Sequence, residues 1–166
     1  MSKAAALLAE FEAELKTTRK FLERLPSDRL AWRPHEKSMT AGQLGLHIAQ
    51  VPKMVLDLSM PDEKEPADFN RPQDQPANVA AILSALDQSA QFVRETLPTI
   101  GDHRMSQIFK VISGDKTLFA APREMFLRSI MLNHWYHHRG QLGVYLRLLG
   151  AKVPSSYGPS GDESPF

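Results

Sequence analysis

The amino-acid sequence predicts an all-α protein, a four-helix bundle with a long crossover connection. Three observations favour this fold class. Four segments carry apolar residues at three- and four-residue spacing, the period of an amphipathic helix. Two of the connections between them are long, and the parallel strands that an α/β fold requires are not visible. At 166 residues, the chain is expected to form a single domain over residues 1–166 with an ordinary apolar core.

The first two predicted helices are set apart by a short irregular segment. The first covers residues 3–25 and ends where a proline follows. The second covers residues 41–58, and Thr40 with Gln43 matches a capping box, in which each of the two residues satisfies a backbone donor at the helix start. Pro52 lies inside this helix and is expected to bend it or loosen one turn.

The second half of the chain contains the longer connections. The segment 60–77 is rich in Pro, Asp and Gln and is expected to be an exposed crossover loop. It leads to the third predicted helix, residues 78–97. The segment 101–121 could form a short hairpin or pack as a loop. A fourth helix is predicted over residues 122–149, and the Pro-, Ser- and Gly-rich tail after residue 153 is expected to lie along the surface.

Composition narrows the function classes. The formal net charge is +1, from 20 basic and 19 acidic residues, so neither nucleic acid nor an anionic membrane is an expected partner. The sequence contains no cysteine, which excludes disulfides, thiolate catalysis and Cys-ligated metal sites. The beginning of the chain is a poor signal peptide, and no apolar stretch approaches the roughly 20 residues of a membrane span. We therefore expect a cytoplasmic protein.

The strongest chemical signal is a pair of histidines in the fourth helix. His134 and His138 are four residues apart and lie about 40° apart on the helix surface, so their side chains stand one turn apart on one face. This spacing lets two imidazoles bind one metal ion. His134 with His137 is a geometrically possible alternative pair. An ideal helical projection places the pair in the middle of the apolar stripe, with Leu148 also inward and Arg139 outward.

His47 occupies an inward position of the second helix, between Leu44 and Val51. A lone histidine there would ordinarily be a core or cleft residue hydrogen-bonded to a carbonyl. If the second and fourth helices are neighbours, however, His47, His134 and His138 can share one metal. Three protein ligands leave positions open for water or substrate, as in catalytic sites. Gln141 lies on the same face as His134, where it could hydrogen-bond a nucleophile at the metal or be satisfied in the core.

Four stretches resemble the DinB family, and together they span nearly the whole chain in the expected order. They are Leu30-Ala-Trp32-Arg-Pro34, Ser38-Met-Thr-Ala-Gly-Gln-Leu-Gly-Leu-His47, His134-Trp-Tyr-His-His138-Arg139-Gly140-Gln141-Leu142 and Tyr145-Leu-Arg-Leu-Leu-Gly150-Ala-Lys-Val-Pro154-Ser-Ser-Tyr157-Gly158. The resemblance implies a four-helix bundle with a long crossover and a three-histidine metal site on His47, His134 and His138. It also implies nickel or zinc as the metal and pairing of the chain as a homodimer.

The resemblance further implies a metal-dependent enzyme. We expect a thiol-dependent S-transferase, using a low-molecular-weight thiol besides its small-molecule substrate, or a related hydrolase. Gln141 and His137 are the residues expected to orient the bound nucleophile. The alternative is a non-catalytic dimeric helical module, in which the metal or the buried histidines only stabilise the bundle. A fourth protein ligand, such as His137 or a carboxylate, would favour that alternative.

Overall fold

The computed structural model describes residues 1–66 and 73–164 and is mostly helical. No helix in these ranges combines the length and the apolar character needed to cross a membrane. The elements follow one another as α1 (Lys3–Glu23), η1 (Ser27–Arg29), α2 (Ala41–Leu58), β1 (Glu63–Lys64), α3 (Val79–Thr96), η2 (Leu97–Thr99), α4 (Asp102–Ser106), β2 (Ile108–Ser113), β3 (Lys116–Pro122), α5 (Arg123–Phe126), η3 (Leu127–Asn133) and α6 (His134–Leu148).

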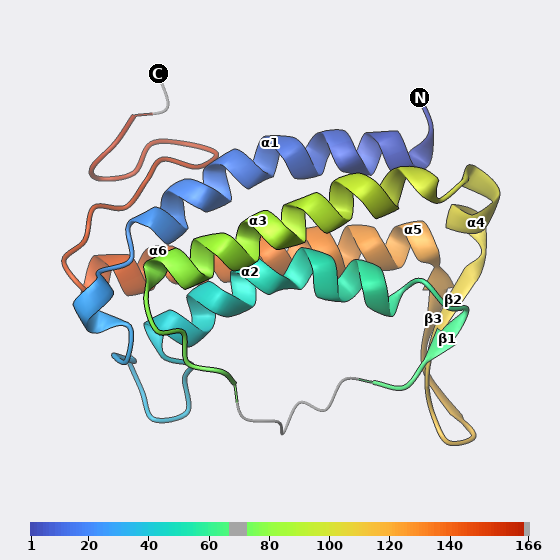
Figure 1. Ribbon diagram of the computed structural model, residues 1–166, viewed down its shortest axis with the longest axis horizontal. Coiled ribbons are helices and arrows are strands. Elements are labelled where there is room, and N and C mark those ends of the chain that lie inside the picture. Colours follow the sequence, from blue (N-terminus) through green and yellow to red (C-terminus); the bar gives the residue numbers. More distant parts are fainter. Residues whose placement is uncertain (67–72, 165–166) are drawn as a thin grey trace.

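Four long helical segments pack side by side: α1, α2, α3 and the stretch from α5 to α6 (Figure 1). In Figure 1, α1 and α6 run one way along the bundle, and α2 and α3 run the other way. Because α2 and α3 are parallel, the chain between them has to return along the length of the bundle. The predicted helical bundle is therefore confirmed, while part of the exposed crossover loop expected over residues 60–77 lies outside the described residues.

Contacts hold both ends of the crossover against the bundle. At its start, the N–H of Lys110 in β2 donates to the carbonyl of Asp62 at 2.9 Å, and β1 pairs with β2. At its end, the side-chain amide of Gln43 donates from Nε2 to the backbone carbonyl of Gln73 at 3.0 Å. The Thr40 hydroxyl donates to Oε1 of Gln75 at 2.7 Å. The predicted capping box of Thr40 and Gln43 is also present, so one short segment both starts α2 and receives the crossover.

A small three-stranded sheet makes the description "all-α" only approximate. The strands lie in the order β1-β2-β3, with β1 parallel to β2 and β2 antiparallel to β3. The hairpin of β2 and β3 turns at Gly114, whose φ of 54° lies in the left-handed region that glycine adopts without strain. Of the two readings left open for residues 101–121, the hairpin is correct. Phe109 on β2 is fully buried and packs against Phe126 with ring centroids 4.6 Å apart, which joins the sheet to the bundle.

One regular helix was predicted over residues 122–149, but the fourth helical stretch changes its winding along its length. It begins as the single turn of α5, continues as the seven-residue π-helix η3 and becomes regular only at His134. The N–H of His134 donates to the carbonyl of Ser129, five residues earlier, which is the π-type bond. The change of winding therefore ends at one of the predicted metal ligands.

A buried arginine fastens the start of this stretch to the end of α2. Arg123 is 0% exposed, and its guanidinium donates to the carbonyls of Ser59 at 2.7 Å, Arg104 at 2.7 Å and Pro61 at 2.9 Å. Its charge is balanced by the carboxylate of Asp62 at 3.2 Å. The two guanidinium groups of Arg104 and Arg123 lower the pKa of Asp62, so this carboxylate stays charged near neutral pH. One side chain thus joins three segments that are distant in sequence.

Replacing Arg123 with glutamine should lower the free energy of unfolding by about 3 kcal/mol or more, because several buried carbonyls would lose their donors. The measurement is urea unfolding followed by circular dichroism. The matched control is Arg94→Gln, which breaks the exposed ion pair of Arg94 with Glu12 and should cost no more than about 1 kcal/mol. Equal losses in the two variants would contradict this account of Arg123.

Candidate metal centre

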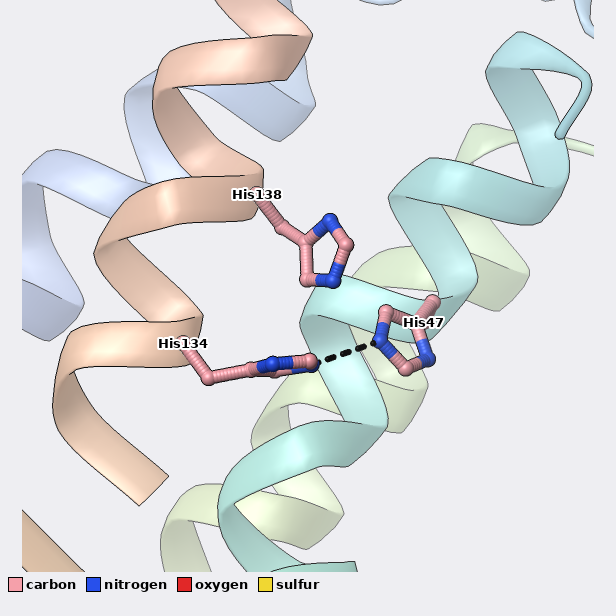
Figure 2. A group of neighbouring side chains, drawn as sticks. All are labelled: His47, His134 and His138. Carbon is pink, nitrogen blue, oxygen red and sulfur yellow. Dashed lines mark hydrogen bonds between the residues drawn. The ribbon is translucent and has the colours of Figure 1, made fainter. Parts of the chain in front are cut away.

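Three histidines from two helices converge between α2 and α6 (Figure 2). His47 comes from α2, and His134 and His138 come from successive turns at the start of α6. One nitrogen of each ring lies within 4.8 Å of the corresponding nitrogens of the other two. Their ring centroids are 4.4 to 5.5 Å apart. The assumption that the second and fourth helices are neighbours is therefore correct, and the three residues form one cluster.

The separation of two ring nitrogens fits a shared metal ion. The Nε2 atoms of His47 and His134 are 3.2 Å apart. Two nitrogens bound to one zinc at about 2.0–2.1 Å, with a tetrahedral angle between them, lie about 3.3 Å apart. No fourth histidine, aspartate or glutamate of the described ranges belongs to the cluster. The donor set suits a borderline transition metal such as nickel or zinc, and it leaves coordination positions free.

The surroundings keep the imidazoles uncharged, as metal ligands must be. Burial, together with the neighbouring His138 and His134, lowers the pKa of His47 from 6.5 to about 4. Burial is also the main cause that lowers the pKa of His134 and that of His138. All three rings are therefore neutral near pH 7, with lone pairs available for a metal.

Gln141 contacts a ring of the cluster. Its Oε1 lies 2.9 Å from Nδ1 of His138, so that Nδ1 carries the proton and donates while Nε2 of the same ring is left as the free ligand atom. His137 is exposed and lies outside the cluster, although its ring centroid is 5.0 Å from that of His138. A role for Gln141 or His137 toward a nucleophile stays a prediction.

The histidines lie at the edge of the buried face of α6, and this corrects the helical projection. Trp135, Arg139, Leu142 and Leu146 lie about 80° to 140° from His134 and enter the core, and Tyr145, about 20° from His134, is buried as well. Leu148, expected inside, is 59% exposed. The three histidines are half-buried, which gives the cluster both a desolvated side and an approach from solvent.

Arg139 was predicted to point outward but is only 2% exposed. It enters the contact between α6 and α1, where its Nη1 lies 2.5 Å from the carboxylate of Glu14 and 3.2 Å from the hydroxyl of Thr18. The rings of Tyr136 and Tyr157 lie on its guanidinium at 5.3 and 5.1 Å. A charged residue can occupy the core side because an opposite charge and two aromatic faces meet it there.

The sequence did not predict the hydrogen bonds that two buried aromatic residues of α6 make. The indole N–H of Trp135 donates to the carbonyl of Ile48 at 2.8 Å, and the hydroxyl of Tyr145 donates to the carbonyl of Met39 at 3.1 Å. Each bond connects α6 to α2 or to the residues just before it. Pro52 was the available signal, since it removes the N–H that would otherwise bond to Ile48.

Comparison with known proteins places this geometry in a family. The sequence profile of the DinB family matches residues 1–164. The chain belongs to the DinB family. Among other DinB-like chains, a crystal structure from Bacillus cereus ATCC 10987 superposes with a TM-score of 0.71 at 24% identity, covering 91% of this chain and 95% of that one.

Two proteins of Bacillus subtilis give the range of similarity around this DinB protein. YrdA of strain 168 is 25% identical over 162 residues, which cover 94% of this chain and 89% of YrdA. YfiT superposes with a TM-score of 0.63 at 15% identity, covering 90% of this chain and 89% of that one. YfiT is described as a probable metal-dependent hydrolase with an unusual four-helix bundle topology. At these identities, the solved structures support the fold of this DinB protein.

The metal-free protein should lose stability as the pH falls from about 6.5 to about 4. Because the folded state lowers the pKa of His47, His134 and His138, the unfolded chain binds more protons in this range, and stability rises with pH. Urea midpoints of chelator-treated protein between pH 4.5 and pH 7.5 measure the effect. His47→Gln should flatten the dependence, whereas a wild-type midpoint that does not change with pH would contradict the assigned pKa shifts.

Proposed function

We propose that this chain is a metal-dependent enzyme that holds one divalent transition metal, nickel or zinc, on His47, His134 and His138. The observation that carries the proposal is the meeting of three uncharged imidazoles with two Nε2 atoms 3.2 Å apart and no fourth ligand among the described residues. A structural metal would ordinarily be enclosed by four protein ligands, so a three-ligand set favours a catalytic role.

The proposed reaction uses a nucleophile formed at the metal. A divalent metal bound there would act as a Lewis acid and lower the pKa of a coordinated water or thiol, so that the nucleophile forms near neutral pH. With water the reaction is a hydrolysis, and with a thiol it is an S-transfer. Since the chain has no cysteine, the thiol would be a small-molecule cosubstrate. The description of YfiT supports the hydrolytic form, and the resemblance noted in the sequence supports the thiol-dependent one.

The chain's own residues orient the ligands and leave one side of the site open. Oε1 of Gln141 accepts a hydrogen bond from the Nδ1–H of His138 and so leaves the Nε2 atom of that ring as the ligand atom. The position of the cluster at the edge of the buried face of α6 admits a small molecule from solvent. The exposed ring of His137, beside His138, is available to a bound substrate.

We also propose that the chain forms a homodimer, as the family resemblance implies. Val144 and Leu148, one turn apart on α6, are 60% and 59% exposed and offer apolar surface for a partner. Sedimentation equilibrium of the purified protein, with Val144→Lys as the disrupting variant, distinguishes a dimer from a monomer.

His134→Ala should abolish both metal binding and turnover while leaving the helical content largely intact. Elemental analysis of protein that has never met a chelator should give about one metal equivalent in the wild type and little in the variant, since two imidazoles bind far more weakly than three. Activity is measured with glutathione and an electrophile for S-transfer, and with an activated ester for hydrolysis. Turnover that persists in the metal-free variant would refute the proposal. Metal without either activity would favour the non-catalytic dimeric module.

Gln141→Met should weaken zinc binding about 10- to 100-fold, because Nδ1 of His138 loses its acceptor and the ring is no longer held in the ligating tautomer. Gln141→Glu keeps an acceptor at that position and should retain most of the affinity. Competition with a chromophoric chelator measures both. Unchanged affinity in Gln141→Met would show that Gln141 does not orient His138.

A further inference from the structure

A hydrogen bond from a side chain to the main chain connects α2 and α6 directly beside the histidine cluster. The indole of Trp135 is 0% exposed and donates to the carbonyl of Ile48 at 2.8 Å. Trp135 follows His134 in the chain, and Ile48 follows His47. The donor and the acceptor of this bond are thus each the immediate neighbour of a ligand.

The carbonyl of Ile48 is available because of Pro52. In a regular α-helix it would accept from the N–H four residues later, but proline has no N–H, and its ring displaces that carbonyl. α3 also supplies a hydrogen-bond partner to the backbone of α2 beside Pro52. The N–H of Lys53 donates to the hydroxyl of Ser89 on α3 at 2.9 Å, and Ser89 is only 1% exposed. Two neighbouring helices therefore complete the backbone of α2 at its proline.

Packing fixes the direction of the indole. The ring of Phe11 on α1, which is fully buried, stacks on Trp135 with centroids 5.2 Å apart and an angle of 18° between the planes. Because one face of the indole is covered, the N–H cannot turn to another acceptor without disturbing the core. The bond to Ile48 is therefore the arrangement that satisfies both buried groups.

We propose that Trp135 is a positioning residue of the metal site, which sets the height at which α6 meets α2 and thereby the separation of His134 from His47. A slide of one residue along a helix is about 1.5 Å, whereas metal–ligand distances tolerate only about 0.2 Å. The bond between Trp135 and Ile48 limits such a slide next to His134 and His47. This inference rests on the proposed metal site, and Trp135 itself touches neither metal nor substrate.

If Trp135 had only a structural role, it would do no more than supply a donor to the carbonyl of Ile48, which Pro52 leaves without a backbone partner. Pro52 makes the two readings separable. Pro52→Ala supplies a backbone N–H to Ile48, so the carbonyl no longer needs the indole. In the double variant Trp135→Phe with Pro52→Ala, the carbonyl is satisfied again, but α6 has lost its tie to α2 beside the histidines.

The experiment measures zinc affinity, the visible absorption of the cobalt(II)-loaded protein and the urea midpoint in wild type, Trp135→Phe and the double variant. Trp135→Phe should weaken zinc binding about tenfold or more and change the cobalt spectrum. The double variant should regain much of the urea midpoint without regaining the affinity or the wild-type spectrum. Recovery of all three quantities together would overturn the positioning role and leave the structural one.

Two controls separate this inference from other causes of weak binding. Phe109→Leu removes buried aromatic volume far from the α2–α6 contact, so it should lower the urea midpoint but keep the zinc affinity. If Trp135→Phe does not fold, 3-benzothienylalanine at position 135 keeps the shape of the indole without its N–H and carries the same expectation. Wild-type protein that binds neither zinc nor nickel would refute the metal site and this inference together. Zinc binding that is equal in wild type and Trp135→Phe would refute the inference alone.

Discussion

The relative height of α2 and α6 is the constraint on which the site depends, because the histidine cluster takes one side chain from α2 and two from α6. Three side chains of the last helical stretch bond to main-chain carbonyls along α2. Arg123 bonds to Ser59 just past its end, Trp135 to Ile48 in its middle, and Tyr145 to Met39 just before its start. Since every acceptor is a main-chain oxygen, the register of the two helices does not depend on which side chains α2 presents at these points. His47, His134 and His138 lie between these bonds, so the register of the two helices fixes their relative positions.

Much of the fold could be predicted from local pattern. Apolar periodicity located the four helical segments, and the capping box placed the start of α2 correctly. The histidine cluster could also be predicted, because a four-residue spacing on one helix needed only a third histidine on a neighbouring helix. What local pattern did not determine was which helices are neighbours, and this came from tertiary packing. The hairpin was ambiguous for the same reason, since its inner face is stabilised by Phe126, which follows it in the chain.

The misplaced residues of α6 have a physical explanation. Taking His134 as the centre of the buried face of α6 put Leu148 inside and Arg139 outside, because the centre lies closer to Trp135, about 100° away. Hydrophobicity alone cannot reveal that an arginine lies inside, because its burial depends on Glu14 and Tyr157 from other parts of the chain, besides Tyr136 on the same helix. With the centre of the buried face near Trp135, the cluster lies at the edge of the core, where all three histidines are half-buried.

The π-helix η3 lies between two bonds that fasten the last helical stretch to α2, at Arg123 and at Trp135, and it affects how many residues can lie between them. From Arg123 to Trp135 the chain advances twelve residues, while the facing part of α2, from Ile48 to Ser59, spans eleven. A wider winding stores more residues in the same axial length, so η3 takes up the additional one without moving either end. A homologue with one residue fewer in this stretch could rewind it as ordinary α-helix and keep both ties. We therefore expect the deletion of a single residue to be tolerated between Arg123 and His134, but not between His134 and His138.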